Sequence, residues 1–138
     1  MPGKILVVDD EPELLQLLRY VLEAAGFSVV VASDGRQALE QVQKEHPDLV
    51  LCDVVMPELN GFETVQALRR NPETRFLPIL MLSARGQAQD VQRALDAGAD
   101  GYVTKPFSYR ELVAEIKRRV PQPAIAVALP VLGRPSRP

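Results

Sequence analysis

The feature of this chain that most constrains its fold is a fivefold alternation between short apolar runs and longer amphipathic stretches. The apolar runs predict β-strands at residues 5–9, 28–32, 49–53, 79–83 and 101–104. The first, third and fourth runs are hydrophobic throughout, as in strands that are buried on both faces of a parallel sheet. The fifth is short and is a weak strand signal by itself.

The stretches between these runs have the periodicity of helices, with apolar residues three and four positions apart. Pro12 near the start of the first stretch and Gly26 after its end are typical helix-boundary residues. The last helix is expected to begin at Ser108, which matches a capping box with Glu111. Strands separated by such helices predict a (βα)5 domain over about residues 4–120, with a parallel sheet covered on both faces. The pattern alone leaves the strand order open.

Composition narrows the class of protein. The 138 residues are enough for one ordinary domain, and the net charge of −2 argues against nucleic-acid binding by this domain. The single cysteine, Cys52, excludes an internal disulfide and a cysteine zinc cage. With no apolar run of membrane-spanning length and no signal-peptide pattern near Met1, we expect a soluble cytoplasmic protein that does not contact a membrane.

The composition changes near residue 120. Residues 121–138 contain five of the twelve prolines and no acidic residue. We therefore interpret residues 1–120 as one domain and residues 121–138 as a proline-rich extension or linker. The alternative is that this segment begins a second domain, because it also contains the apolar stretch 124–132.

Polar side chains follow four of the five predicted strands. Asp9 and Asp10 end the first strand, Asp53 the third and Ser83 the fourth, and Lys105 follows the fifth. Because the carboxyl ends of parallel strands meet at one edge of a sheet, we expect these side chains to gather there. Crowded carboxylates need a proton or a cation, and a site with oxygen ligands only favours Mg²⁺.

This set of groups is suited to phosphoryl chemistry. A divalent cation, the Lys105 ammonium and the Ser83 hydroxyl can together bind a phosphoryl group. Asp53 is then the candidate nucleophile, and its product is an aspartyl phosphate. Simpler interpretations exist for each residue alone: Asp10 can begin a helix, Ser83 can cap one, and Lys105 can be a solvated surface lysine.

The motifs at these positions resemble those of response-regulator receiver domains of two-component signalling, including the chemotaxis regulators. They are ILVVDDE at residues 5–11, DVVMP at 53–57, NG at 60–61, LSA at 82–84, GADGY at 98–102 and KPF at 105–107. The resemblance covers about residues 4–120, and it implies a flavodoxin-like sheet in the order 2-1-3-4-5, which chemotaxis receivers share.

The resemblance also implies the roles of the site residues. Asp53 would accept a phosphoryl group from a sensor histidine kinase. Mg²⁺ would be bound by Asp10, Asp53 and the main-chain carbonyl of Val55, with Asp9 acting through water. Lys105 would contact the phosphate from a cis Lys-Pro peptide.

A switch is implied as well. Ser83 would be the switch hydroxyl and Tyr102 its aromatic partner, and together they would change the surface of the fourth helix, fifth strand and fifth helix. That surface would control a partner or an output domain. Catalysis would be limited to the domain's own phosphorylation and dephosphorylation. Gly101 and Glu115 replace charges of the dimer found in one transcriptional subfamily, which leaves open a phosphorylation-dependent dimer of another kind.

Two alternative functions are weighed against this one. A phosphatase with an aspartyl nucleophile would need its second aspartate two residues after the first, where this chain has Glu11 after Asp9. A receiver-like binding module that is never phosphorylated would not need the complete set of acidic residues, serine and lysine. A nucleotide-binding enzyme is disfavoured because no glycine-rich phosphate loop follows the first strand.

Overall fold

The computed structural model describes residues 3–54, 60–83 and 88–120. Strands and helices alternate along the chain as predicted. Their order is β1 (Lys4–Val8), α1 (Pro12–Ala24), β2 (Ser28–Ala32), α2 (Gly35–Glu45), β3 (Leu49–Asp53), α3 (Gly61–Arg70), β4 (Ile79–Ser83), α4 (Ala88–Ala97), β5 (Gly101–Thr104) and α5 (Tyr109–Arg119). Within these ranges, no helix has both the length and the apolar character that crossing a membrane requires.

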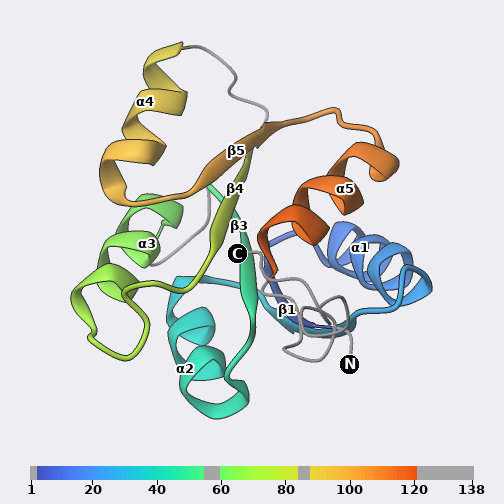
Figure 1. Cartoon of the computed structure of the whole chain (residues 1–138), viewed down its shortest axis with the longest axis horizontal. Coiled ribbons are helices and arrows are strands. Elements are labelled where there is room, and N and C mark those ends of the chain that lie inside the picture. The colour runs from blue at the N-terminus through green and yellow to red at the C-terminus, as the bar shows by residue number, and fades with distance from the viewer. Residues whose placement is uncertain (1–2, 55–59, 84–87, 121–138) are drawn as a thin grey trace, which may run out of the picture.

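The five strands form one parallel sheet in the order β2-β1-β3-β4-β5 (Figure 1). Val8 lies opposite Ala32 and Cys52, so the ends of β1, β2 and β3 are level with one another. Ser83 lies opposite Thr104 in the β4–β5 pair. The flavodoxin-like (βα)5 fold is therefore confirmed, and all five strands end at the same edge.

Helices cover both faces of the sheet. α2, α3 and α4 lie on one face, and α1 and α5 lie on the other (Figure 1). Alternate residues of each central strand face the two layers: Leu6 and Val8 pack in one cluster, and Ile5 and Val7 pack in the other. This arrangement explains the continuous apolar runs in the sequence. β5 lies at the edge of the sheet and is only partly buried, which explains its weaker pattern.

The helix ends agree with the local sequence signals except at α5, where the predicted capping box is incomplete. Gly26 adopts a φ of 101° after α1, the left-handed conformation that glycine tolerates best. At α5, the Glu111 N–H donates to Ser108 Oγ at 3.3 Å, but the Glu111 carboxylate makes no return bond. The complete capping box lies at α3 instead, where Asn60 and Glu63 exchange hydrogen bonds of 2.9 and 3.0 Å.

Candidate functional site

Three carboxylates gather at the carboxyl-terminal edge of the sheet. One oxygen each from Asp9, Asp10 and Asp53 lies within 4.8 Å of the others. Asp9 and Asp53 are buried, whereas Asp10 is exposed at the mouth of the cluster. The topology thus brings together the acidic residues that the sequence places after β1 and at the end of β3.

The backbone around β1 fixes two of these carboxylates. The Asp9 N–H donates to the Ala32 carbonyl at 3.1 Å and prolongs the pairing with β2. The Asp9 Oδ1 then accepts a hydrogen bond of 3.0 Å from the Glu11 N–H, immediately before α1. Glu11 occupies the N-cap position of α1, so Asp10 does not cap this helix and its side chain remains available at the pocket.

The end of β3 is held by close packing against α3. The Gly61 N–H donates to the Val54 carbonyl at 2.9 Å. A Cβ atom at Gly61 would overlap the Asp53 carbonyl oxygen, Val54 and the Met81 side chain. Glycine therefore lets the first turn of α3 approach the backbone of Asp53. This close approach was not predicted from residues 60–61, which were interpreted only as part of a motif, although the Asn-Gly pair was its signal.

Lys105 brings a positive charge into the cluster. Its Nζ lies 3.5 Å from Asp53 Oδ1 and 3.5 Å from Asp9 Oδ2, and 4.0 Å from an oxygen of Glu11. Its backbone N–H donates to the Ser83 carbonyl at 2.7 Å, and the peptide bond to Pro106 is cis, as the motif implied. The lysine after β5 thus reaches the carboxylate of β3 across the intervening strand β4.

Among the residues that the structure describes, the pocket holds more negative than positive charge. The pKa of Asp53 is raised to about 6, mainly by burial and then by the nearby negative charge of Asp9, while the charge of Lys105 lowers it. Burial also raises the pKa of Asp9, against the stabilising hydrogen bond from Glu11 and the charge of Lys105. One ammonium therefore does not balance three carboxylates. Oxygen ligands with excess negative charge suit a hard divalent cation such as Mg²⁺.

The two predicted switch residues, Ser83 and Tyr102, lie on the neighbouring strands β4 and β5. Ser83 is the buried last residue of β4. Tyr102 on β5 is half-buried and packs against the hydrophobic cluster beneath α2, α3 and α4. Val55, the predicted carbonyl ligand, lies outside the described residues.

Cys52 precedes Asp53 and is fully buried in the cluster on the α2–α4 face, as its place in the strand predicts. Its thiol lies 3.4 Å from the Asp53 carbonyl oxygen. Burial raises the pKa of this thiol well above its usual range. Cys52 therefore acts as a packing residue in this structure.

The family model described as "Response regulator receiver domain" matches residues 5–117. The chain belongs to the response-regulator receiver family. It is 47% identical over 117 residues to the alkaline phosphatase synthesis transcriptional regulatory protein PhoP of Bacillus subtilis, a match that covers 85% of this chain and 48% of that protein. It is 41% identical over 136 residues to the phosphate regulon transcriptional regulatory protein PhoB of Escherichia coli, covering 96% of this chain and 59% of that protein. This receiver chain thus spans about half to three-fifths of these relatives.

Solved receiver structures have the same fold. The chemotaxis protein CheY4 of Vibrio cholerae superimposes with a TM-score of 0.82 at 37% identity, covering 86% of this chain and 99% of that one. The receiver domain of the sensor histidine kinase PA1611 of Pseudomonas aeruginosa gives a TM-score of 0.80 at 29% identity, covering 87% and 98%. That structure has a magnesium ion coordinated in its active site cleft.

Proposed function

We propose that this receiver is a phosphorylation-dependent switch in which Asp53 accepts a phosphoryl group from a sensor histidine kinase. The observation that carries the proposal is the position of the Lys105 ammonium, 3.5 Å from both Asp53 and Asp9. A buried carboxylate with a cation beside it, and with two more acidic groups within 4.8 Å, fits a phosphoacceptor better than a structural ion pair.

The chemistry begins at a carboxylate oxygen of Asp53. This oxygen attacks phosphorus, the bond from phosphorus to the imidazole nitrogen of the kinase breaks, and an acyl phosphate forms on the aspartate. A pKa of about 6 leaves Asp53 mostly ionised at pH 7, as a nucleophile must be. Lys105 lies where it can neutralise an oxygen of the incoming phosphoryl group.

Asp10 and Asp53 would hold Mg²⁺ directly, together with the main-chain carbonyl of Val55, and Asp9 would act through water. Support comes from the donor set, which consists of carboxylate oxygens with too little positive charge among them. When bound, Mg²⁺ supplies positive charge to the phosphoryl oxygens. The exposure of Asp10 leaves this side of the cluster open to solvent, from which a cation can enter.

Phosphorylation would then change the outer surface. The phosphoryl group adds nearly two negative charges and three acceptor oxygens, which attract the Ser83 hydroxyl and Lys105. As the end of β4 moves, the half-buried ring of Tyr102 turns further inward and reshapes the surface of α4, β5 and α5. That surface would control an output domain or partner, with residues 121–138 as the linker after a domain of residues 1–120. The match to PhoB extends past residue 120, which supports the linker.

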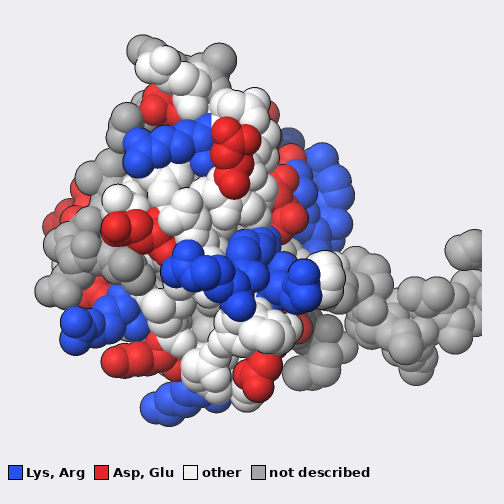
Figure 2. Space-filling view, turned by 90° about the vertical axis from the view of Figure 1, so that its left-hand side faces the viewer, with Lys and Arg blue, Asp and Glu red and all other residues white. Residues whose placement is uncertain are grey.

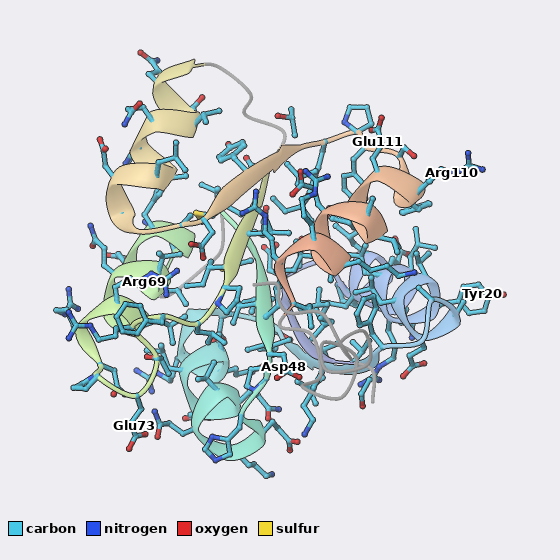
Figure 3. The ribbon with its side chains drawn as sticks, viewed as in Figure 1. Tyr20, Asp48, Arg69, Glu73, Arg110 and Glu111 are labelled. Carbon is cyan, nitrogen blue, oxygen red and sulfur yellow. The ribbon has the colours of Figure 1, made fainter. Side chains whose placement is uncertain are left out.

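Intact-mass analysis with a small phosphodonor tests this proposal. Acetyl phosphate with Mg²⁺ should add one phosphoryl group to the wild-type chain and none to Asp53→Asn. The matched control is Asp48→Asn, because Asp48 lies at the opposite end of β3 (Figure 3), where its carboxylate accepts from the Lys4 N–H. Asp48→Asn should be labelled like the wild type. Equal labelling of Asp53→Asn would overturn the assignment.

A further inference from the structure

A groove with an exposed aromatic ring lies at the amino-terminal edge of the sheet. It has a volume of about 260 Å³ and is lined by Phe76, Pro78, Asp100, Arg118 and Arg119. Pro78 and Asp100 immediately precede β4 and β5, and the two arginines end α5. Because a five-residue strand spans roughly 16 Å, this groove is separate from the pocket around Asp53 at the other edge.

Phe76 is the most exposed large hydrophobic residue in the described part of the chain, with 86% of its surface accessible. The guanidinium of Arg75 lies 5.3 Å from the centre of its ring. The structure thus presents an apolar surface with a cation against it. Phe and Arg are both enriched at protein–protein interfaces relative to the rest of the protein surface.

The far wall of the groove is also positively charged. Glu115 pairs with both Arg118, at 3.3 Å, and Arg119, at 3.0 Å, so one carboxylate serves two guanidinium groups. Figure 2 views a different side of the molecule, the one on which α2, α3 and α4 lie, and Lys and Arg side chains gather across its middle as well.

Asp100, the one acidic residue among the described residues that line the groove, is already engaged. The Asp100 Oδ2 accepts hydrogen bonds from Arg69 at 2.9 Å and from the Ile79 N–H at 2.8 Å. Its charge is therefore offset by Arg69, and the arginines around Phe76 leave the groove with an excess of positive charge. A ligand that complements this groove must combine an apolar group with negative charge.

We propose that this groove binds an acidic protein segment, which places an apolar side chain against Phe76 and its carboxylates near Arg118 and Arg119. The volume is below the roughly 300–1,000 Å³ of small-molecule pockets, which favours one side chain of a longer partner. Residues 121–138 of the chain itself contain no acidic residue and do not supply this charge. A nucleic acid fits less well, because the chain has a net charge of −2 and Asp100 forms part of the wall.

The probe is an acetylated and amidated peptide of sequence Asp-Asp-Leu-Phe-Glu-Glu, titrated into the full chain without phosphodonor and followed by NMR chemical shifts. Saturable shifts are expected at Phe76 and Arg118. Phe76→Ala should weaken binding about tenfold through lost apolar burial. Arg118→Gln should weaken it about threefold, as expected for an exposed charge pair. A neutral control peptide, with Asn and Gln in place of the acidic residues, should bind the wild-type chain no more tightly than the acidic peptide binds either variant.

Two matched variants act as controls. Tyr20→Ala removes another aromatic residue, 73% exposed on α1, and Arg110→Gln removes an arginine from the start of α5. In Figure 3, Tyr20 lies on α1 and Arg110 lies at the start of α5, the end of that helix opposite to Arg118 and Arg119. Neither should change the affinity. The proposal is overturned by equal weakening in Arg110→Gln, by the absence of saturable shifts, by tighter binding of a single-stranded DNA oligonucleotide, or by self-association that Phe76→Ala abolishes.

Discussion

The two edges of the sheet carry clusters of charge that differ in how well the charges are matched. At the amino-terminal edge, Arg69 donates five hydrogen bonds, including one to Asp100 at 2.9 Å, and its guanidinium joins α3 to the turns before β4 and β5. At the carboxyl-terminal edge of the described structure, three aspartates lie together, two of them pair with Lys105, and the pKa of Asp53 rises to about 6. The matched cluster, Arg69 with its acceptors, holds helices and strands together. The unmatched cluster, the three aspartates with Lys105, has excess negative charge and favours binding of a cation.

The largest effect is expected from breaking the matched cluster. Arg69→Ala would leave the Leu77 and Gly98 carbonyls and the Asp100 carboxylate without this donor, which should lower the free energy of unfolding by about 3–4 kcal/mol. Urea denaturation measures this change. The neighbouring exposed Arg70 is the control, and Arg70→Ala should stay within about 0.5 kcal/mol of the wild type. A loss below 1 kcal/mol in Arg69→Ala would show that the cluster is not a structural clamp.

A cation should stabilise the unmatched cluster almost as strongly. At one hundred times its dissociation constant, Mg²⁺ should raise the free energy of unfolding by about 2.7 kcal/mol, because it binds the folded chain. Asp10→Ala should remove this response and, because Asp10 is exposed, cost little in Mg²⁺-free buffer. Asp96→Ala, at an exposed aspartate of α4, should keep it. An unchanged magnesium response in Asp10→Ala would contradict the proposed ligand set.

Without Mg²⁺, the ionised form of Asp53 should destabilise the fold. Its pKa is raised from 3.8 to about 6, so the folded state binds the proton more tightly than the unfolded state, and its contribution to stability falls as the pH rises from about 4 to about 6. Asp53→Asn should therefore be more stable than the wild type by about 2 kcal/mol at pH 7. Urea denaturation from pH 4 to pH 7 should show this advantage disappearing at the acid end. A difference that does not vary with pH would refute the electrostatic explanation.

The smallest effect is expected at Glu11. Its side chain is 67% exposed and lies 4.0 Å from Lys105, so solvent screens the pair. Glu11→Gln should change the pKa of Asp53 by less than about 0.5, as measured by NMR titration. Lys105→Gln removes the less exposed cationic partner of Asp53, 22% exposed, and should raise that pKa clearly further. If Glu11→Gln and Lys105→Gln shifted the pKa of Asp53 equally, solvent would not screen the exposed Glu11 charge more than the charge of Lys105, contrary to this expectation.

The sequence predicted the strands and their alternation with helices. It also predicted that Asp9, Asp53 and Lys105 lie close together, because the carboxyl ends of parallel strands meet at one edge of the sheet regardless of the loop conformations. It did not predict the strand order from pattern alone; that came from family motifs. β1 is observed one residue earlier than predicted, as Lys4–Val8, since Asp9 already turns towards α1.

The role of Arg69 could not be read from the sequence, because its partners at Gly98 and Asp100 lie 29 and 31 residues away and are brought close only by the folded turns. The capping box of α3 had a readable signal, Asn60 followed three residues later by Glu63, which matches the spacing expected of such a motif. Its assignment to Ser108 and Glu111 was only half right. Local signals were therefore available at the helix ends, whereas long-range contacts were not.

The most direct test of the central claim is to locate the acyl phosphate chemically. After reaction with acetyl phosphate and Mg²⁺, borohydride reduces an aspartyl phosphate to homoserine, and peptide mass mapping identifies the residue. Homoserine is expected at position 53 alone. Homoserine at position 9 or 10, or a phosphorylated chain with none, would contradict it.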